Sequence, residues 1–172
     1  MRFGDFLKAT VLLSAASATV LAALTVIGVS RRLDETAAYV CVGWWALATA
    51  IGITLGSREG ATAPIARLLA TARAQQSLPE LHPARTIFNR LWPLLVCTLG
   101  AGVLSIFAPQ IGGIAAGFAI IWSLSWRRQE AAVAAVEARD GARFYVDKTS
   151  PLSAIRLIRT PGFSGDFAGM RA

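Results

Sequence analysis

The chain has 172 residues, enough for one domain. Apolar residues make up 55% of it and charged residues only 16%, whereas soluble domains average about 25% charged residues. This deficit argues against an ordinary soluble domain and indicates a membrane protein. The net charge is +7. Which partner this charge favours depends on where the basic residues lie along the chain.

Three long stretches contain no Asp, Glu, Lys, Arg or His: residues 9–30, 36–57 and 91–126. A transmembrane helix needs about 20 mostly apolar residues, so each of the first two stretches predicts one span. The first stretch also follows a basic start and contains small residues, as a cleavable signal peptide does. Its apolar run is longer than the usual limit of about 15 residues for such a peptide, so we expect an uncleaved anchor.

The third stretch, 91–126, is too long for one straight span. Pro109 and the pair Gly112-Gly113 lie near its middle, and such residues commonly mark turns. We therefore predict a hairpin of two short spans, 91–107 and 111–126. The alternative is a re-entrant hairpin that does not reach the far side of the membrane.

The basic residues predict the orientation. Of the 17 Lys and Arg residues, all but Arg31 and Arg32 fall in the N-terminal segment, in the loop 58–90 or in the tail 127–172. Four spans place these three regions on one side, and basic loops are retained in the cytoplasm. We therefore predict two cytoplasmic termini and an anionic inner leaflet beside the basic groups. The basic residues are spread singly and no recognised module is present, so we expect no nucleic-acid partner.

The loop 58–90 contains an amphipathic pattern. Ile65, Leu68, Leu69 and Ala72 follow the i, i+3, i+4, i+7 spacing of one helix face. The loop therefore predicts a short helix that lies in the inner interface with its apolar side toward the lipid.

The tail predicts a helix extension followed by a β-hairpin. We expect the helix to continue from Trp126 through Arg139 and to stop at Gly141. Residues 144–146 and 155–159 then predict two short strands, and a two-stranded ribbon alone is only marginally stable. Its apolar residues therefore need a surface to cover them. We predict a site for docking a partner protein, with the protein's own loop as the alternative cover, formed by Phe144, Tyr145, Ile155, Leu157 and Ile158.

This tail, over the segments 143–146, 149–151 and 155–163, resembles the ending of a group of uncharacterised small membrane proteins from high-GC Gram-positive bacteria. The resemblance covers the tail and a general four-span pattern. It implies a location in a bacterial inner membrane, and it implies no activity or ligand.

Two glycine pairs have the spacing of closely packed membrane helices: Gly52 with Gly56, and Gly113 with Gly117. We expect them to pack helices within one chain, with a homo-oligomer as the alternative. Two tryptophans in the middle of the second span, at positions 44 and 45, are expected to pack against other spans or a partner.

No catalytic, metal or cofactor site is expected. The only histidine, His82, has one nearby carboxylate, Glu80, and a metal site usually needs three or four ligands. Cys41 and Cys97 fall at different predicted depths, so we expect free, buried thiols. The spans contain no Asp, Glu, Lys, Arg or His, and such residues usually mark ion and proton pathways.

The sequence therefore predicts an all-α membrane protein with four transmembrane helices, an interfacial helix and a small cytoplasmic tail. The leading hypothesis for its function is a non-enzymatic accessory or structural subunit that docks through this tail. The alternative is a small transport or channel component that works as an oligomer, with hydroxyls and glycines lining a pore. A lipid-modifying enzyme that uses His82 and Glu80 is the least favoured hypothesis.

Overall fold

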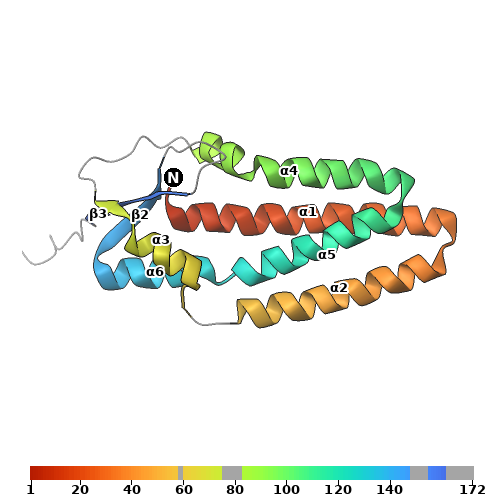
Figure 1. Cartoon of the computed structure of the whole chain (residues 1–172), viewed down its shortest axis with the longest axis horizontal. Coiled ribbons are helices and arrows are strands. Elements are labelled where there is room, and N and C mark those ends of the chain that lie inside the picture. The colour runs from red at the N-terminus through yellow and green to blue at the C-terminus, as the bar shows by residue number, and fades with distance from the viewer. Residues whose placement is uncertain (58–59, 75–82, 148–154, 162–172) are drawn as a thin grey trace, which may run out of the picture.

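The computed structural model of the protein describes residues 1–57, 60–74, 83–147 and 155–161. The long helices lie side by side, and the shorter elements gather at the end that holds the N-terminus (Figure 1). The described elements, in chain order, are α1 (Phe3–Arg32), α2 (Glu35–Gly56), α3 (Ala63–Ala70), β1 (Arg73–Ala74), α4 (Pro83–Phe107), α5 (Pro109–Trp126), α6 (Gln129–Asp140), β2 (Ala142–Val146) and β3 (Leu157–Pro161).

Three of the described helices are long and apolar enough to cross a membrane. They are α1, α2 and the part of α4 from Ala84 to Phe107, and they correspond to the predicted spans 9–30, 36–57 and 91–107. These helices are compatible with a multi-pass membrane protein. The fourth predicted span, 111–126, corresponds to α5, which is not among the three.

Helix α5 packs against each of the other three long helices. Its buried residues are mostly small: Gly112, Gly113, Ala116, Gly117 and Ala119. Small side chains let neighbouring backbones approach closely, so α5 accepts α1 on one side and α2 on another. The same glycines, together with Gln110, lower its mean hydropathy.

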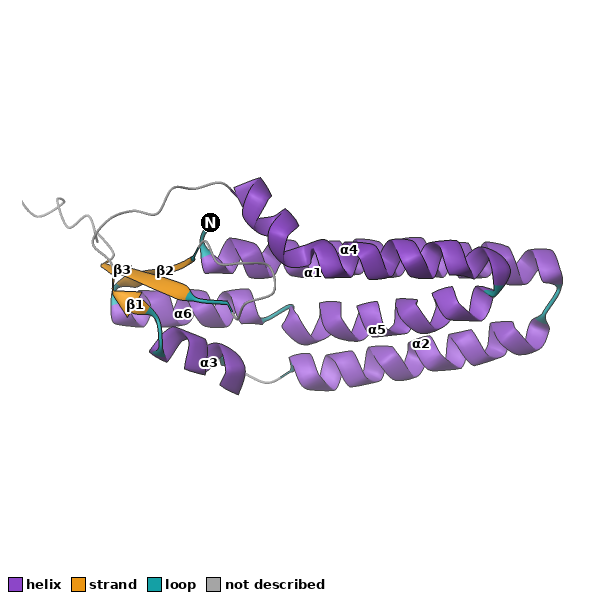
Figure 2. Ribbon diagram, turned by 45° about the horizontal axis from the view of Figure 1, so that its top comes forward, coloured by secondary structure: helices purple, strands orange, loops and turns teal. Residues whose placement is uncertain are grey.

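One face of α2 attaches it to α5, which lies beside it in Figure 2. The buried residues of α2 are all small and mostly four positions apart: Ala37, Cys41, Ala48, Gly52 and Gly56. This spacing places them on one side of a helix. Tyr39, Val40 and Val42, which lie between them in the sequence, are exposed.

The turn between α1 and α2 is bonded to the turn between α4 and α5. Arg32 donates hydrogen bonds to the carbonyl oxygens of Ile106 at 3.1 Å and Phe107 at 2.7 Å, which would otherwise lack partners at the end of α4. Gln110 reaches Asp34 across the same gap at 3.5 Å. The hairpin of α4 and α5 therefore extends as far along the molecule as the start of α2.

Helices α5 and α6 are separated by a short break in the helical chain. Arg127 and Arg128 form a turn between α5 and α6, so the prediction of one continuous helix from Trp126 was wrong. Helix α6 ends at Asp140, and Gly141 adopts a left-handed conformation with φ of 57°. Glycine reaches this conformation without the steric cost of a Cβ atom, which explains the predicted stop.

The predicted hairpin is part of a three-stranded sheet with the order β1-β3-β2. Strands β2 and β3 are antiparallel, with Tyr145 opposite Ile158. Strand β1 adds to β3 in parallel, with Arg73 beside Ile158, and Arg2 forms a bridge to Tyr145 at the other edge. The loop, through β1, and the N-terminal segment, through Arg2, thus flank the two edges of the tail hairpin.

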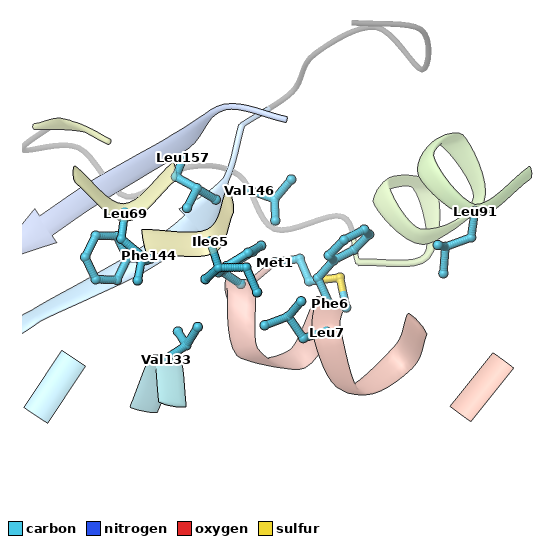
Figure 3. Packing of buried hydrophobic residues seen from close by; sticks show 11 residues of the cluster. Met1, Phe6, Leu7, Ile65, Leu69, Leu91, Val133, Phe144, Val146 and Leu157 are labelled. Atoms are coloured by element: carbon cyan, nitrogen blue, oxygen red, sulfur yellow. The ribbon is translucent and has the colours of Figure 1, made fainter. Parts of the chain in front are cut away.

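A hydrophobic core fills the space between this sheet and the helices (Figure 3). Its members come from α1, α3, α4, α6 and the sheet, so residues far apart in the sequence share one core. The core residues are Met1, Phe3, Phe6, Leu7, Ile65, Leu69, Leu91, Val133, Phe144, Val146 and Leu157.

The amphipathic helix in the loop is present as α3, but its apolar side does not face lipid. Ile65 is 1% exposed and Leu69 is 9% exposed, and both belong to the core. Leu68 and Ala72 pack against the same core. The predicted interfacial orientation was therefore wrong, because the apolar stripe covers the sheet and the start of α1.

Candidate functional site

The candidate site is the end of the molecule where the short helices and the sheet gather beside the N-terminus, and we call this part the head. The head consists of α3, α6, the three strands and the first two turns of α1, and it takes residues from both sides of the predicted boundary at residue 126. Phe3 and Leu7 of α1 are each 1% exposed and belong to the same core as Phe144 of β2. Figure 3 shows Leu7 and Phe144 within this core. Removing the tail would therefore uncover the beginning of α1.

Polar contacts fix the elements of the head to each other. Gln129 is 2% exposed, and its Oε1 accepts a hydrogen bond of 3.0 Å from the backbone N–H of Thr62, just before α3. Glu137 of α6 accepts a bond of 2.9 Å from the backbone N–H of Phe144. Because these bonds satisfy backbone groups that no helix or strand partner reaches, α6 holds both the loop and the tail.

The five residues predicted to dock a partner are covered within the protein. Phe144 and Leu157 lie in the core, at 2% and 3% exposure, and Ile155 packs against it. Tyr145 and Ile158 face each other on the opposite side of the sheet and are also buried, at 6% and 7%. This arrangement matches the alternative in which the tail docks on its own chain. A partner would have to contact other residues of the head.

Nearly all described basic residues lie at the head end of the molecule. They sit at the start of α1, on α3, at the start of α4, around the break before α6 and on the sheet. Arg31 and Arg32 alone among the described Lys and Arg residues lie at the opposite end. The fold therefore gathers the charges that the sequence analysis assigned to three separate cytoplasmic regions.

The four glycines predicted to pack helices lie together between α2 and α5 of one chain. A Cβ atom on Gly52 would lie 2.8 Å from the Cβ of Leu124, closer than the about 3.5–4.0 Å of ordinary carbon contacts. A Cβ on Gly56 would overlap the carbonyl oxygen of Leu124, one on Gly113 would overlap the side chain of Cys41, and one on Gly117 would overlap the indole of Trp44.

The two tryptophans of α2 also bond to α5. The indole N–H of Trp45 donates to the carbonyl of Gly113 at 2.8 Å, and that of Trp44 donates to Ile114 at 3.1 Å. Trp44 further makes an edge-on contact with Phe118, with ring centres 5.4 Å apart. Aromatic N–H groups usually find a partner when they leave water, and here the partners are backbone carbonyls of the neighbouring helix.

Several hydroxyls of the long helices bond to their own backbones. Thr10, Ser14 and Thr25 are buried, and each donates to the carbonyl four residues earlier, at 2.8–2.9 Å. Ser105 donates to Gly102 at 2.6 Å. This local pairing satisfies polar groups within an apolar bundle, and it leaves the hydroxyl protons engaged rather than directed at a solute.

Reactive side chains are sparse in the described part of the chain. Cys41 and Cys97 are both free thiols; Cys41 is buried, but Cys97 is exposed on α4, so its predicted burial was wrong. No group of three His, Cys, Asp or Glu residues within the described segments has a geometry suited to a metal ion. His82 and Glu80 lie outside the described residues. On the head surface, a hydrogen bond from Arg139 lowers the pKa of Asp140.

No model of a protein family matches this chain, and neither a curated protein nor a solved structure matches it significantly.

The sequence did not predict several contacts that hold the structure together. Strand β1 is only two residues long, too short for any alternating pattern. The sequence placed Arg32 only outside the three predicted cytoplasmic regions, although its side chain caps α4. Gln129 was included in a helix extension, where a single polar residue carries no signal of burial.

Proposed function

We propose that the protein is a four-span membrane protein of a bacterial inner membrane, with α5 as the fourth span and the head in the cytoplasm. The hydrogen bonds from Arg32 to the end of α4 support a hairpin that reaches the same depth as the other spans. Helix α5 touches three helices, so it exposes less surface to lipid and needs less hydropathy. The gathering of basic residues at the head end supports a cytoplasmic head, because such residues are retained there.

We further propose that the protein is a non-enzymatic accessory subunit, and that the head is the part that binds its partner. One contrast carries this proposal. The long helices are joined by close contacts at glycines and by indole bonds, whereas the head builds its own core from four separated parts of the chain. A protein that served only as a membrane anchor would not need such a head. The core holds the surface residues of the head in a defined arrangement, which is what a binding surface requires.

The alternative function, an oligomeric transport component, has less support. A pore inside one chain would need open polar groups, but the buried hydroxyls of Thr10, Ser14 and Thr25 are bonded to their own helix. A pore between copies would instead use the exposed surfaces of α2 and α4. These surfaces carry large apolar side chains such as Val42 and Leu99, at 61% and 70% exposure, which suit lipid rather than water.

Site-specific photocrosslinking in living cells tests the two functions together. A photoreactive amino acid would be placed at exposed head positions, Arg67 and Arg139, and at exposed positions of the long helices, Val42 and Leu99. The accessory function predicts a discrete adduct with another protein from the head positions alone. Adducts between copies of this chain from Val42 or Leu99, with none from the head, would instead support the oligomeric transport component.

Truncation after Gly141 is a poor test of docking. It would remove β2 and β3 and expose the core around Phe3 and Ile65. The loss of a partner from such a variant would report an unfolded head. Single replacements of exposed residues keep the core intact and are the better test.

A further inference from the structure

The first turns of α4, residues 84–92, form a segment that we call the arm. Pro93 follows it directly within the helix. A proline in a helix interior lacks the N–H that would bond to the residue four positions earlier, and it bends the helix. Figure 2 shows the first turns of α4 at an angle to the rest of that helix.

One side of the arm belongs to the head. Leu91 is 8% exposed and is part of the core, and Ile87 packs against the same core. These two residues are four positions apart, so they lie on one side of the helix. The arm is therefore attached to the head through this side.

The other side of the arm exposes two aromatic side chains and one charge. Phe88 is 65% exposed and Trp92 is 36% exposed, and their spacing of four places them together on one side of the helix. Arg85 precedes Phe88 by three residues and is exposed on the same side. Among the described residues, no carboxylate forms an ion pair with Arg85. Large exposed apolar side chains beside a charge indicate a surface that another molecule covers.

This aromatic side continues the exposed apolar side of the rest of α4. Beyond Trp92, exposed apolar side chains follow at intervals of three and four residues: Val96, Leu99, Val103 and Ile106. The helix from Ala84 to Phe107 is long and apolar enough to cross a membrane. One apolar surface therefore runs from the candidate span to Phe88 without a change of side.

The length of α4 places the arm at the boundary of the lipid. At about 1.5 Å per residue, the helix from Phe88 to Phe107 is about 29 Å long, and the hydrocarbon core of a bilayer is about 30 Å thick. With Phe107 at one boundary, Phe88 lies at the other. Arg85 then lies about 4.5 Å farther out, at the level of the lipid headgroups. The bend at Pro93 keeps both residues close to this boundary, because it turns the arm away from the membrane normal.

We propose that the arm binds anionic lipid of the inner leaflet, with Phe88 and Trp92 inserted at the hydrocarbon boundary and Arg85 paired with the lipid headgroup. Aromatic rings favour this boundary, and anionic lipids attract basic groups. Interfacial helices combine both kinds of side chain. This inference rests on the proposed location of the head in the cytoplasm.

Lipid binding at the arm holds the head against the membrane. The two sides of the arm have different partners, since Ile87 and Leu91 contact the head core while Phe88 and Trp92 contact lipid. A partner protein is the other possible occupant of the aromatic side. Lipid is favoured because it already covers the continuous apolar side of α4 and because its headgroups match the charge of Arg85.

Fluorescence quenching in nanodiscs measures where the arm lies. In a full chain with both native cysteines replaced by alanine, a single cysteine at Phe88 is labelled with bimane. Leu99→Cys provides the lipid-facing reference and Arg139→Cys provides the head-surface reference. The quenchers are phosphatidylcholine that carries a nitroxide close to its headgroup, and iodide in solution.

We expect the lipid nitroxide to quench the label at Phe88→Cys and not the label at Arg139→Cys. Iodide should quench Arg139→Cys strongly, Phe88→Cys weakly and Leu99→Cys least. The proposal would be overturned if iodide quenched Phe88→Cys as strongly as Arg139→Cys, because the aromatic side of the arm would then face water.

A second measurement tests the preference for anionic lipid. Phosphatidylglycerol with the same nitroxide, at the same mole fraction, should associate with the label about two- to fivefold more strongly than phosphatidylcholine, as one exposed ion pair implies. Arg85→Gln should abolish this preference. Arg67→Gln removes the same charge from an exposed position on α3 and should leave the preference unchanged. A preference that survives Arg85→Gln, or that both replacements reduce equally, would overturn the role of Arg85.

Photocrosslinking separates the failure of this inference from the failure of the proposed function. A photoreactive amino acid at Phe88 that gives a discrete adduct with another protein would refute lipid binding and support the accessory function. Lipid quenching at Phe88→Cys, with no adduct from Arg67 or Arg139, would support lipid binding and refute the accessory function. Intrinsic tryptophan fluorescence and thermal unfolding confirm that the variants remain folded.

Discussion

A single methyl group at Gly52 should separate two helices, whereas the same methyl group at Gly43 should not. Both glycines belong to α2, but Gly43 has no atom within 4 Å of an added Cβ. At Gly52 the added Cβ would lie 2.8 Å from the Cβ of Leu124 and 3.3 Å from the Cα of Ile121. These two neighbours are held by the α5 backbone and cannot rotate away.

The distances give the size of the effect. Carbon atoms prefer separations of about 3.5–4.0 Å, so α2 has to move away from α5 by roughly 1 Å at this point. Overpacking of this kind costs about 1–3 kcal/mol. The shift would also stretch the bond of 2.8 Å from Trp45 to Gly113. By contrast, replacing an exposed helical glycine by alanine is favourable by up to about 1 kcal/mol.

Unfolding of the purified protein in mixed micelles, followed by tryptophan fluorescence, measures both variants. We expect Gly52→Ala to lose about 1–3 kcal/mol of unfolding free energy and Gly43→Ala to equal or exceed wild type. If Gly52→Ala were as stable as Gly43→Ala, α2 and α5 would not approach as closely as Leu124 requires, and the packing argument would be wrong.

Three further replacements test individual contacts by the same unfolding assay. Gln129→Leu removes the buried acceptor of the half-buried Thr62 N–H and should cost about 1–3 kcal/mol, and a neutral result would mean that water replaces this bond. Arg32→Ala should destabilise the protein by about 1–3 kcal/mol because it uncaps α4, whereas the neighbouring Arg31→Ala should change little; equal effects would contradict the cap. Glu130→Gln should cost well below about 1 kcal/mol, because its contact with Lys8 spans 3.8 Å between exposed side chains, and a larger loss would reveal a stronger role.

The apolar patterns of the sequence predicted where helices form better than they predicted whether an apolar side chain faces lipid or protein. Ile65 and Leu69 have helical spacing whether they face lipid or protein, since both surroundings are apolar. The same limit explains Cys97, whose exposed position on α4 is indistinguishable by composition from a buried one. The apolar side of α3 turns inward because Ile65 and Leu69 share one core with the tail strands and the start of α1.

The head was only partly predictable because its parts are distant in the sequence. The strand around Phe144 was evident from its own residues, and so was the stop at Gly141. The pairing of Arg73 with Ile158 joins the loop to the tail, and no local pattern encodes such a contact. The glycine pairs, by contrast, were recognisable because close helix packing needs small residues at a fixed spacing.

The side of the membrane that holds the head is the central claim, and cysteine labelling of intact cells measures it. In a chain with both native cysteines replaced by alanine, single cysteines would be placed at Leu33, which is 86% exposed in the turn after α1, and at Arg139 on the head. A membrane-impermeant maleimide should label the Leu33→Cys chain in intact cells and the Arg139→Cys chain only after lysis. Labelling of the Arg139→Cys chain in intact cells would place the head outside and contradict a cytoplasmic docking function.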